Sequence, residues 1–127
     1  MSYHFSKTLE IPFDDAVLKV TEELKKEGFG VLTEIDVKST LKKKLDVDFR
    51  QYKILGACNP PLAYEALKAE DKIGTMLPCN VIVYERGDKT VVGAFDPMMI
   101  TTVSGNPELI PIATEIESRL RTVIEAI

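Results

Sequence analysis

The sequence predicts one α+β domain in which a single mixed, mainly antiparallel sheet carries helices packed on one face. Three observations lead to this fold class. The first expected strand alternates apolar and polar residues, as strands do when one face of a sheet is uncovered. The last two strands flank Gly87-Asp88, which has the form of a two-residue hairpin turn. Segments with apolar residues at helical spacing lie between the other strands, which gives the order β-α-β-α-β-α-β-β-α. The chain of 127 residues fits a single domain, residues 1–127.

The N-terminal part of the chain begins with a strand at residues 3–9, with Tyr3 on its apolar side. A helix over residues 13–26 follows, because its apolar residues recur every three or four positions. Its acidic start and its lysine-rich end suit the helix dipole. Gly28 ends the helix, and residues 29–35 form the second strand.

The middle of the chain predicts two more helices and a strand. Ser39 is the expected cap of a short helix, and residues 51–57 form the third strand. Asn59 is a good N-cap and Pro60 suits the first position of the following helix. That helix ends near Gly74.

The last part of the chain predicts a hairpin and a final helix. Residues 80–86 and 89–95 form the two strands of the hairpin, so Val81 should oppose Ala94. The final helix begins near Pro111 and carries one apolar stripe, formed by Ile112, Ile116, Leu120, Val123, Ile124 and Ile127. The uncovered face of the sheet should meet solvent or a second subunit.

The composition excludes several classes of protein. Sixteen basic and twenty acidic residues give a net charge of −4, which argues against nucleic acid as the main partner. The N-terminus lacks the pattern of a secretory signal, and no apolar run approaches the roughly 20 residues of a membrane span. Two cysteines are too few for a disulfide scaffold, so we expect a cytoplasmic protein with reduced thiols and no membrane partner. A single histidine excludes a two-histidine metal site, and no metal site is predicted.

Three segments resemble the signature stretches of the domain of unknown function 302 family. These are residues 28–36 (GFGVLTEID), 54–60 (ILGACNP) and 77–85 (LPCNVIVYE), and Asp96-Pro97 with the following methionines also fits. The resemblance spans nearly the whole chain. It implies a small α+β fold near the TATA-binding-protein-like folds and a homodimer. It implies no established activity and no cofactor, and the fold likeness says nothing about DNA.

The candidate site residues are Cys58, Asn59, Cys79, Asn80 and Asp96. Cys58 precedes a helix N-terminus, where unpaired N–H groups and the helix dipole lower a thiol pKa from about 8.5 to between roughly 3.5 and 7.5. Extending the hairpin register outward places Cys79 opposite Asp96, and a carboxylate beside a thiol raises its pKa. These strand ends and the helix N-terminus should converge on one pocket.

Two functions follow from this constellation. The first is a non-catalytic, homodimeric module that binds a small ligand or a partner near these five residues. The second is a thiol-dependent enzyme or redox protein that uses Cys58, with Cys79 as the resolving thiol. Each cysteine could instead be a small buried apolar residue of the core. The separation of the two cysteines and the pKa of Cys58 distinguish the two functions.

Overall fold

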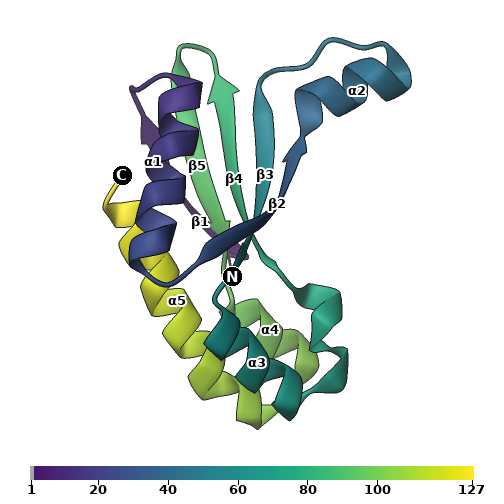
Figure 1. The fold of residues 1–127 in the computed structure, drawn as a ribbon, viewed down its shortest axis with the longest axis vertical. Helices are drawn as coiled ribbons and strands as arrows, with labels where there is room; N and C mark the ends of the chain where they lie inside the picture. Colours follow the sequence, from purple (N-terminus) through teal and green to yellow (C-terminus); the bar gives the residue numbers. More distant parts are fainter. Residues whose placement is uncertain (1) are drawn as a thin grey trace.

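The computed structural model describes residues 2–127 and confirms the α+β fold class (Figure 1). Five strands form one fully antiparallel sheet, and the helices gather on one face and at one end of it. In chain order the elements are β1 (His4–Leu9), α1 (Phe13–Lys26), β2 (Gly30–Asp36), α2 (Val37–Leu45), β3 (Tyr52–Cys58), α3 (Pro60–Ala69), the 3₁₀ helix η1 (Asp71–Met76), β4 (Cys79–Arg86), β5 (Lys89–Phe95), α4 (Met98–Ser104), the 3₁₀ helix η2 (Pro107–Leu109) and α5 (Ile110–Glu125).

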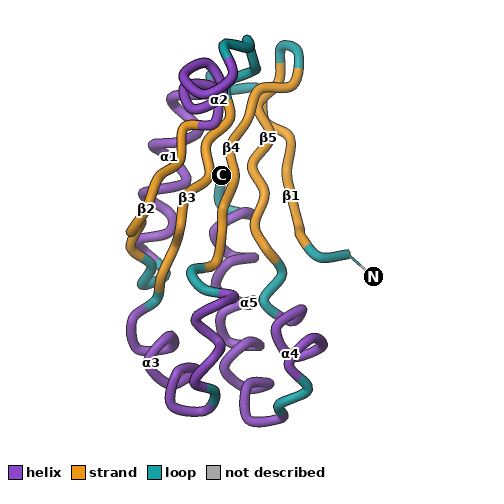
Figure 2. Tube along the Cα trace, turned by 90° about the vertical axis from the view of Figure 1, so that its right-hand side faces the viewer, coloured by secondary structure: helices purple, strands orange, loops and turns teal. Residues whose placement is uncertain are grey.

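The strands lie in the order β1-β5-β4-β3-β2, so the β4–β5 hairpin occupies the middle of the sheet and β2 one edge. Figure 2 shows the sheet face-on, with α1 and α5 behind it and no helix lying flat across its front. The sheet is therefore covered on one face and open on the other. The helix α2 projects from the top of the sheet, and α3 and α4 lie below its lower end (Figures 1 and 2).

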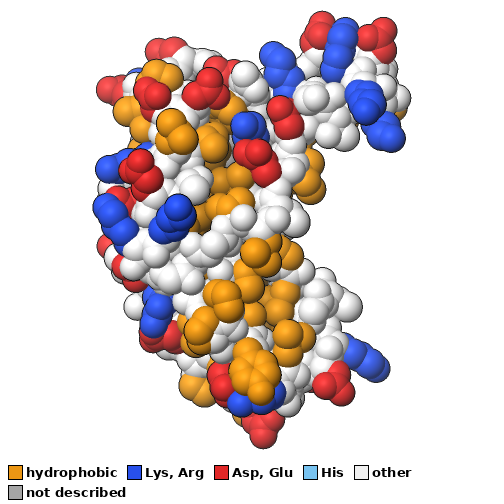
Figure 3. Space-filling model, in the orientation of Figure 1, with side chains coloured by type: hydrophobic (Ala, Val, Ile, Leu, Met, Phe, Trp, Pro, Cys, Tyr) orange, Lys and Arg blue, Asp and Glu red, His pale blue; other side chains and the backbone are white. Residues whose placement is uncertain are grey.

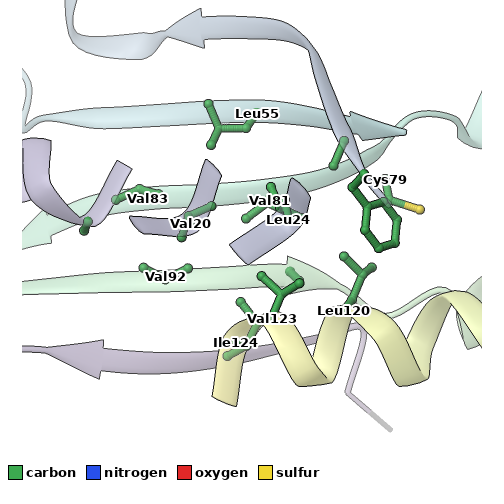
Figure 4. Close-up of a cluster of buried hydrophobic side chains, with 14 of the residues drawn as sticks. Val20, Leu24, Leu55, Cys79, Val81, Val83, Val92, Leu120, Val123 and Ile124 are labelled. Carbon is green, nitrogen blue, oxygen red and sulfur yellow. The ribbon is translucent and has the colours of Figure 1, made fainter. Parts of the chain in front are cut away.

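The main core lies between the sheet and the helices α1 and α5 (Figure 4). Alternate residues of the central hairpin point into it, because successive side chains of a strand face opposite sides. Val81 and Val83 of β4 are fully buried, and Val92 of β5 lies beside them. The apolar stripe of α5 is confirmed: its buried residues are Ala113, Ile116, Leu120, Val123 and Ile124.

The hairpin register is also confirmed. Val81 pairs with Ala94, and Arg86 pairs with Lys89 at the turn. Gly87 has φ of 62°, a conformation that glycine adopts without steric cost and that suits the first position of this turn. The local turn chemistry therefore sets which residues of both central strands face the core.

Four sequence expectations were wrong. The helix expected to end near Gly74 ends at Ala69, and the 3₁₀ helix η1 follows it. Tyr3 lies outside β1, and its ring packs edge-on against His4 at 4.8 Å instead of joining the apolar side of the strand. Asp36, not Ser39, caps α2, because the Asp36 carboxylate accepts a hydrogen bond of 3.0 Å from the Ser39 backbone N–H. The element order also omitted α4, a seven-residue helix that ends at Gly105.

Gly56 allows two neighbouring segments to come close to β3. A Cβ atom at this position would lie 2.2 Å from Thr33 Oγ1 and 2.8 Å from Pro78 Cγ. Thr33 belongs to the edge strand β2, whereas Pro78 directly precedes β4. Any side chain larger than hydrogen at position 56 would displace one or both.

Among residues 2–127, none of the helices combines the length and the apolar character that a membrane crossing requires.

Helix α1 offers a matched pair of leucines that tests the core. Leu24 is 0% exposed and Leu18 is 64% exposed. We expect Leu24→Ala to lower the free energy of unfolding by about 3 kcal/mol, through lost burial and the cavity left behind. Leu18→Ala should change it by less than about 0.5 kcal/mol. Urea denaturation of both variants measures the difference, and equal effects would contradict this packing of α1.

Candidate functional site

An apolar cavity of about 310 Å³ lies where β3 and β4 approach α3, η1 and α5. Figure 3 shows apolar side chains gathered over α3 and the adjoining end of the sheet. Both cysteines line this cavity. The lining residues are Phe29, Leu32, Ala57, Cys58, Asn59, Ala63, Ala66, Leu67, Ile73, Gly74, Leu77, Pro78, Cys79, Ile100, Leu109, Ile112, Ala113 and Ile116.

The start of α3 forms one wall of the cavity. Asn59 caps this helix, with its Oδ1 accepting a hydrogen bond of 3.3 Å from the Leu62 backbone N–H. The Asn59 side chain also donates to the Glu27 carbonyl at 3.4 Å, which links α3 to the loop before β2. Asn59 is buried and its polar atoms have these partners, so it contributes shape to the cavity and not a free polar group.

Cys58 is not an activated thiol. Burial raises its pKa above the ordinary value, opposite to the shift expected beside a helix N-terminus. The expectation of a lowered pKa at Cys58 was therefore wrong, because desolvation dominates at this position.

Cys79 is a buried thiol at the end of the core (Figure 4). Its pKa is raised to about 11, first by burial and second by the charge of the nearby Cys58. The sequence predicted a raised pKa, but it assigned the effect to Asp96. In the sheet, Cys79 pairs with Ala57 of β3, and this pairing brings it close to the neighbouring Cys58. Both cysteines are free thiols in this structure.

Asn80 and Asp96 do not line the apolar cavity, so the five predicted residues do not form one site. Asn80 follows Cys79 in β4, and its side chain therefore points to the open face of the sheet. The Asp96 carboxylate lies elsewhere, because the β4–β5 ladder ends before it and Asp96 N–H donates to the Tyr3 carbonyl at 2.8 Å. Its Oδ1 accepts from Met98 N–H at 3.0 Å, and its Oδ2 lies 3.9 Å from Arg121.

Asp96 forms a carboxyl pair with Glu117 of α5. Burial raises the pKa of Glu117, and so does its hydrogen bond with Asp96. Arg121 lies beside both carboxyl groups, at 3.9 Å from Asp96 and 3.8 Å from Glu117. This pair anchors the start of the α4 segment to α5.

A second and larger hollow, of about 710 Å³, lies over the open face of the sheet. Figure 3 shows it in profile, as the concave side of the molecule between the projecting α2 and the lower helices. It is lined by Tyr3, His4, Ser6, Arg50, Tyr52, Asn80, Ile82, Tyr84, Arg86, Val91, Gly93, Ala94 and Phe95. We call it the open-face groove.

Among residues 2–127, no three His, Cys, Asp or Glu side chains are placed to hold a metal ion together. The methionines that follow Asp96 lie apart from the cysteine cavity: Met98 approaches Thr114, and Met99 lines a separate hollow beside η1.

A model of one protein family matches residues 5–127, and its description is "Domain of unknown function DUF302". This chain belongs to the DUF302 family. The uncharacterized conserved protein DUF302 from Bacillus stearothermophilus, known from a crystal structure, is 31% identical to it. The alignment covers 99% of this chain and 98% of that chain, with a TM-score of 0.92. No curated protein is significantly similar in sequence. DUF302 membership confirms the resemblance and the fold, and it assigns no activity.

Sequence reasoning missed most of the residues that line both hollows of this DUF302 protein. The cavity draws on α3, η1, η2 and α5, whose packing depends on the whole fold. The open-face groove had a local signal: Arg50 and Tyr52, and likewise Tyr84 and Arg86, are spaced two apart. That spacing places each pair on one side of a strand.

The two thiols of this DUF302 protein should react slowly with iodoacetamide at neutral pH. A raised pKa leaves a smaller thiolate fraction than in an ordinary cysteine, and only the thiolate reacts. Mass spectrometry of the Cys58→Ser and Cys79→Ser variants, over a range of pH, gives one titration for each remaining thiol. Cys58 should titrate above the ordinary range of a free thiol, and so should Cys79, because burial still raises its pKa when Cys58 is replaced. A Cys58 that titrates well below that range would contradict this electrostatic description.

Proposed function

We propose that this DUF302 protein is a non-catalytic, homodimeric module that binds a small apolar ligand in the cavity lined by Cys58, Asn59 and Cys79. The observation that supports it is the cavity itself, about 310 Å³ in volume and lined mostly by aliphatic side chains. Ligand pockets are usually preformed hollows of a few hundred Å³ with few polar groups. This lining offers apolar surface and two neutral thiols, so the fitting ligand is uncharged and largely hydrocarbon.

The thiol chemistry favours binding over catalysis. A nucleophilic or redox cysteine needs a thiolate near neutral pH, and burial holds the pKa of both thiols high. The two cysteines nevertheless share one cavity, which keeps a redox pair as the alternative function. A Cys58 pKa measured below the ordinary range, together with a disulfide formed by mild oxidation, would favour that alternative.

The proposed dimer uses the edge strand β2 and the projecting helix α2. Four large apolar residues are exposed there: Leu32 (67%), Ile35 (48%), Leu45 (65%) and Val47 (43%). An uncovered apolar edge strand is a template for pairing with another chain, and α2 has no buried residue of its own. A second copy placed against this edge covers these side chains.

The cavity and the proposed interface share one residue. Leu32 is the extra residue of a bulge between Val31 and Thr33, and it lines the cavity while remaining largely exposed. A second copy against β2 would therefore close the outer side of the cavity. This shared wall is the reason for proposing that ligand binding and dimerisation belong to one function.

We also propose a cytoplasmic location, because reduced thiols suit a compartment that keeps cysteines unoxidised.

Filling the cavity should abolish ligand binding. Ala63 of α3 lines the cavity, and Ala63→Phe places a ring inside it. The probe is N-phenyl-1-naphthylamine, an uncharged dye that fluoresces in apolar surroundings. We expect saturable binding to the wild type and at least tenfold weaker binding to Ala63→Phe. Ala126→Phe, at the exposed end of α5, is the matched control. Unchanged binding to Ala63→Phe would refute the cavity as the binding site.

The dimer prediction is tested by sedimentation equilibrium at micromolar concentration. We expect twice the chain mass for the wild type and a monomer for Ile35→Lys, because a buried unpaired charge at the interface is costly. Leu18→Lys, on the exposed side of α1, should remain a dimer. Circular dichroism checks that all three proteins are folded. A monomeric wild type would rule out the homodimer.

A further inference from the structure

We propose that the open-face groove is a second ligand site, separate from the apolar cavity, and that it binds a small planar aromatic anion. The groove has a volume of about 710 Å³, compared with about 310 Å³ for the apolar cavity. Its lining includes Arg50, Arg86 and His4 but no aspartate or glutamate. The whole chain carries a net charge of −4, whereas the groove lining carries basic side chains and no carboxylates. The lining is therefore more positively charged than the chain as a whole.

Two arginines line the groove, Arg50 in the segment before β3 and Arg86 at the end of β4. Tyr52 pairs with Tyr84, and the Glu85 N–H donates to the Gln51 carbonyl at 3.0 Å, so the ladder continues outward. Continued by two residues beyond Tyr52 and Tyr84, this register would set Arg50 opposite Arg86. Like charges directly opposite each other on a sheet are destabilising, and a bound anion relieves that repulsion.

These two arginines also lack a partner carboxylate. The sequence contains four arginines, and among residues 2–127 Arg119 and Arg121 form ion pairs whereas Arg50 and Arg86 form none. Arg50 is held over the Phe49 ring, with its guanidinium carbon 4.5 Å from the ring centre. This contact restrains the side chain while leaving its N–H groups free to bind an anion.

A stack of aromatic side chains lies next to the two arginines along the strands. The rings of Tyr52 and Tyr84 are stacked, with centres 5.0 Å apart and planes 9° from parallel. Phe49 continues the series, 6.4 Å from Tyr52. Burial raises the pKa of Tyr52, so its hydroxyl stays protonated and can donate a hydrogen bond. Planar ligands bind such surfaces by stacking.

The floor of the groove is flat beyond the tyrosines. Ile82 pairs with Gly93, and a Cβ at Gly93 would lie 3.4 Å from both Ile82 Cγ1 and Ser6 Cβ. The missing side chain leaves a shallow apolar surface between β4 and β5. A ring placed there has apolar contact below it, and its anionic substituent points to Arg50 and Arg86. Charge complementarity therefore favours this occupant over a second copy of this acidic chain.

Tyrosine fluorescence reports on this site directly. The chain has four tyrosines and no tryptophan, and Tyr3, Tyr52 and Tyr84 all line the groove. The probe is naphthalene-2-sulfonate, which joins a planar ring to an anion. We expect saturable quenching of tyrosine emission by this probe. Methanesulfonate, with the anion alone, and 2-naphthalenemethanol, with the ring alone, should each bind at least tenfold more weakly.

The double variant R50Q/R86Q should weaken naphthalene-2-sulfonate binding at least tenfold without unfolding, because both side chains are exposed. Lys72→Gln, an exposed charge on η1 outside the groove, is the matched control and should bind as the wild type does. Ala63→Phe, which fills the apolar cavity, should also leave this binding unchanged. Binding in the groove and binding in the cavity therefore succeed or fail separately.

Three results would overturn the proposal. The first is a failure of the binding test itself, seen either as no saturable quenching at millimolar probe or as equal binding to R50Q/R86Q and the wild type. The second is tighter, arginine-dependent binding of a single-stranded oligonucleotide, which would assign the groove to nucleic acid. The third is a loss of dimer mass in R50Q/R86Q, which would show that a second copy occupies this face.

Discussion

The two-residue period of the central β4–β5 hairpin is the constraint on which the rest of the structure depends. The turn at Gly87 sets the register, and the register sends Val81, Val83 and Val92 into the core. The same period sends Ile82, Tyr84 and Gly93 to the opposite face. A shift of one residue would exchange the two faces, burying tyrosine hydroxyls and exposing the valines. Core packing and the open-face groove are thus two results of one register.

The apolar cavity at the end of the sheet arises for a different reason. At the start of α3 the first backbone N–H groups have no partner within the helix, and Asn59 accepts the hydrogen bond of one of them, from Leu62. The helices that follow turn away from the strands and leave an apolar cavity between them. Desolvation in this cavity outweighs the helix N-terminus, so Cys58 and Cys79 remain neutral thiols. The two hollows therefore differ in chemistry. The cavity is apolar and lies among helices, whereas the open-face groove is lined by arginine and aromatic side chains.

How far the sequence predicts this structure depends on whether a feature is local. The hairpin register and the stripe of α5 follow from neighbouring residues, and both were predicted correctly. Helix α4 was missed because its short segment is rich in β-branched residues, which are weak helix formers. The place of Asp96 was missed because the hairpin ladder stops before it, and no local signal marks that end. The pairing of Tyr52 with Tyr84 links strands separated by a helix, so sequence alone did not reveal the groove.

Gly56 determines how closely the edge strand β2 and the wall of the apolar cavity pack against β3. The space above its Cα is filled from the sheet edge by Thr33 and from the cavity wall by Pro78. Both neighbours are closer than a Cβ would tolerate, so movement of either one changes the room available to β3. The edge strand and the cavity wall therefore pack against the same point of β3, at a residue that has no side chain. Even a methyl group at position 56 would press against both of them at once, so the cavity wall and the pairing of the sheet edge depend on the same glycine.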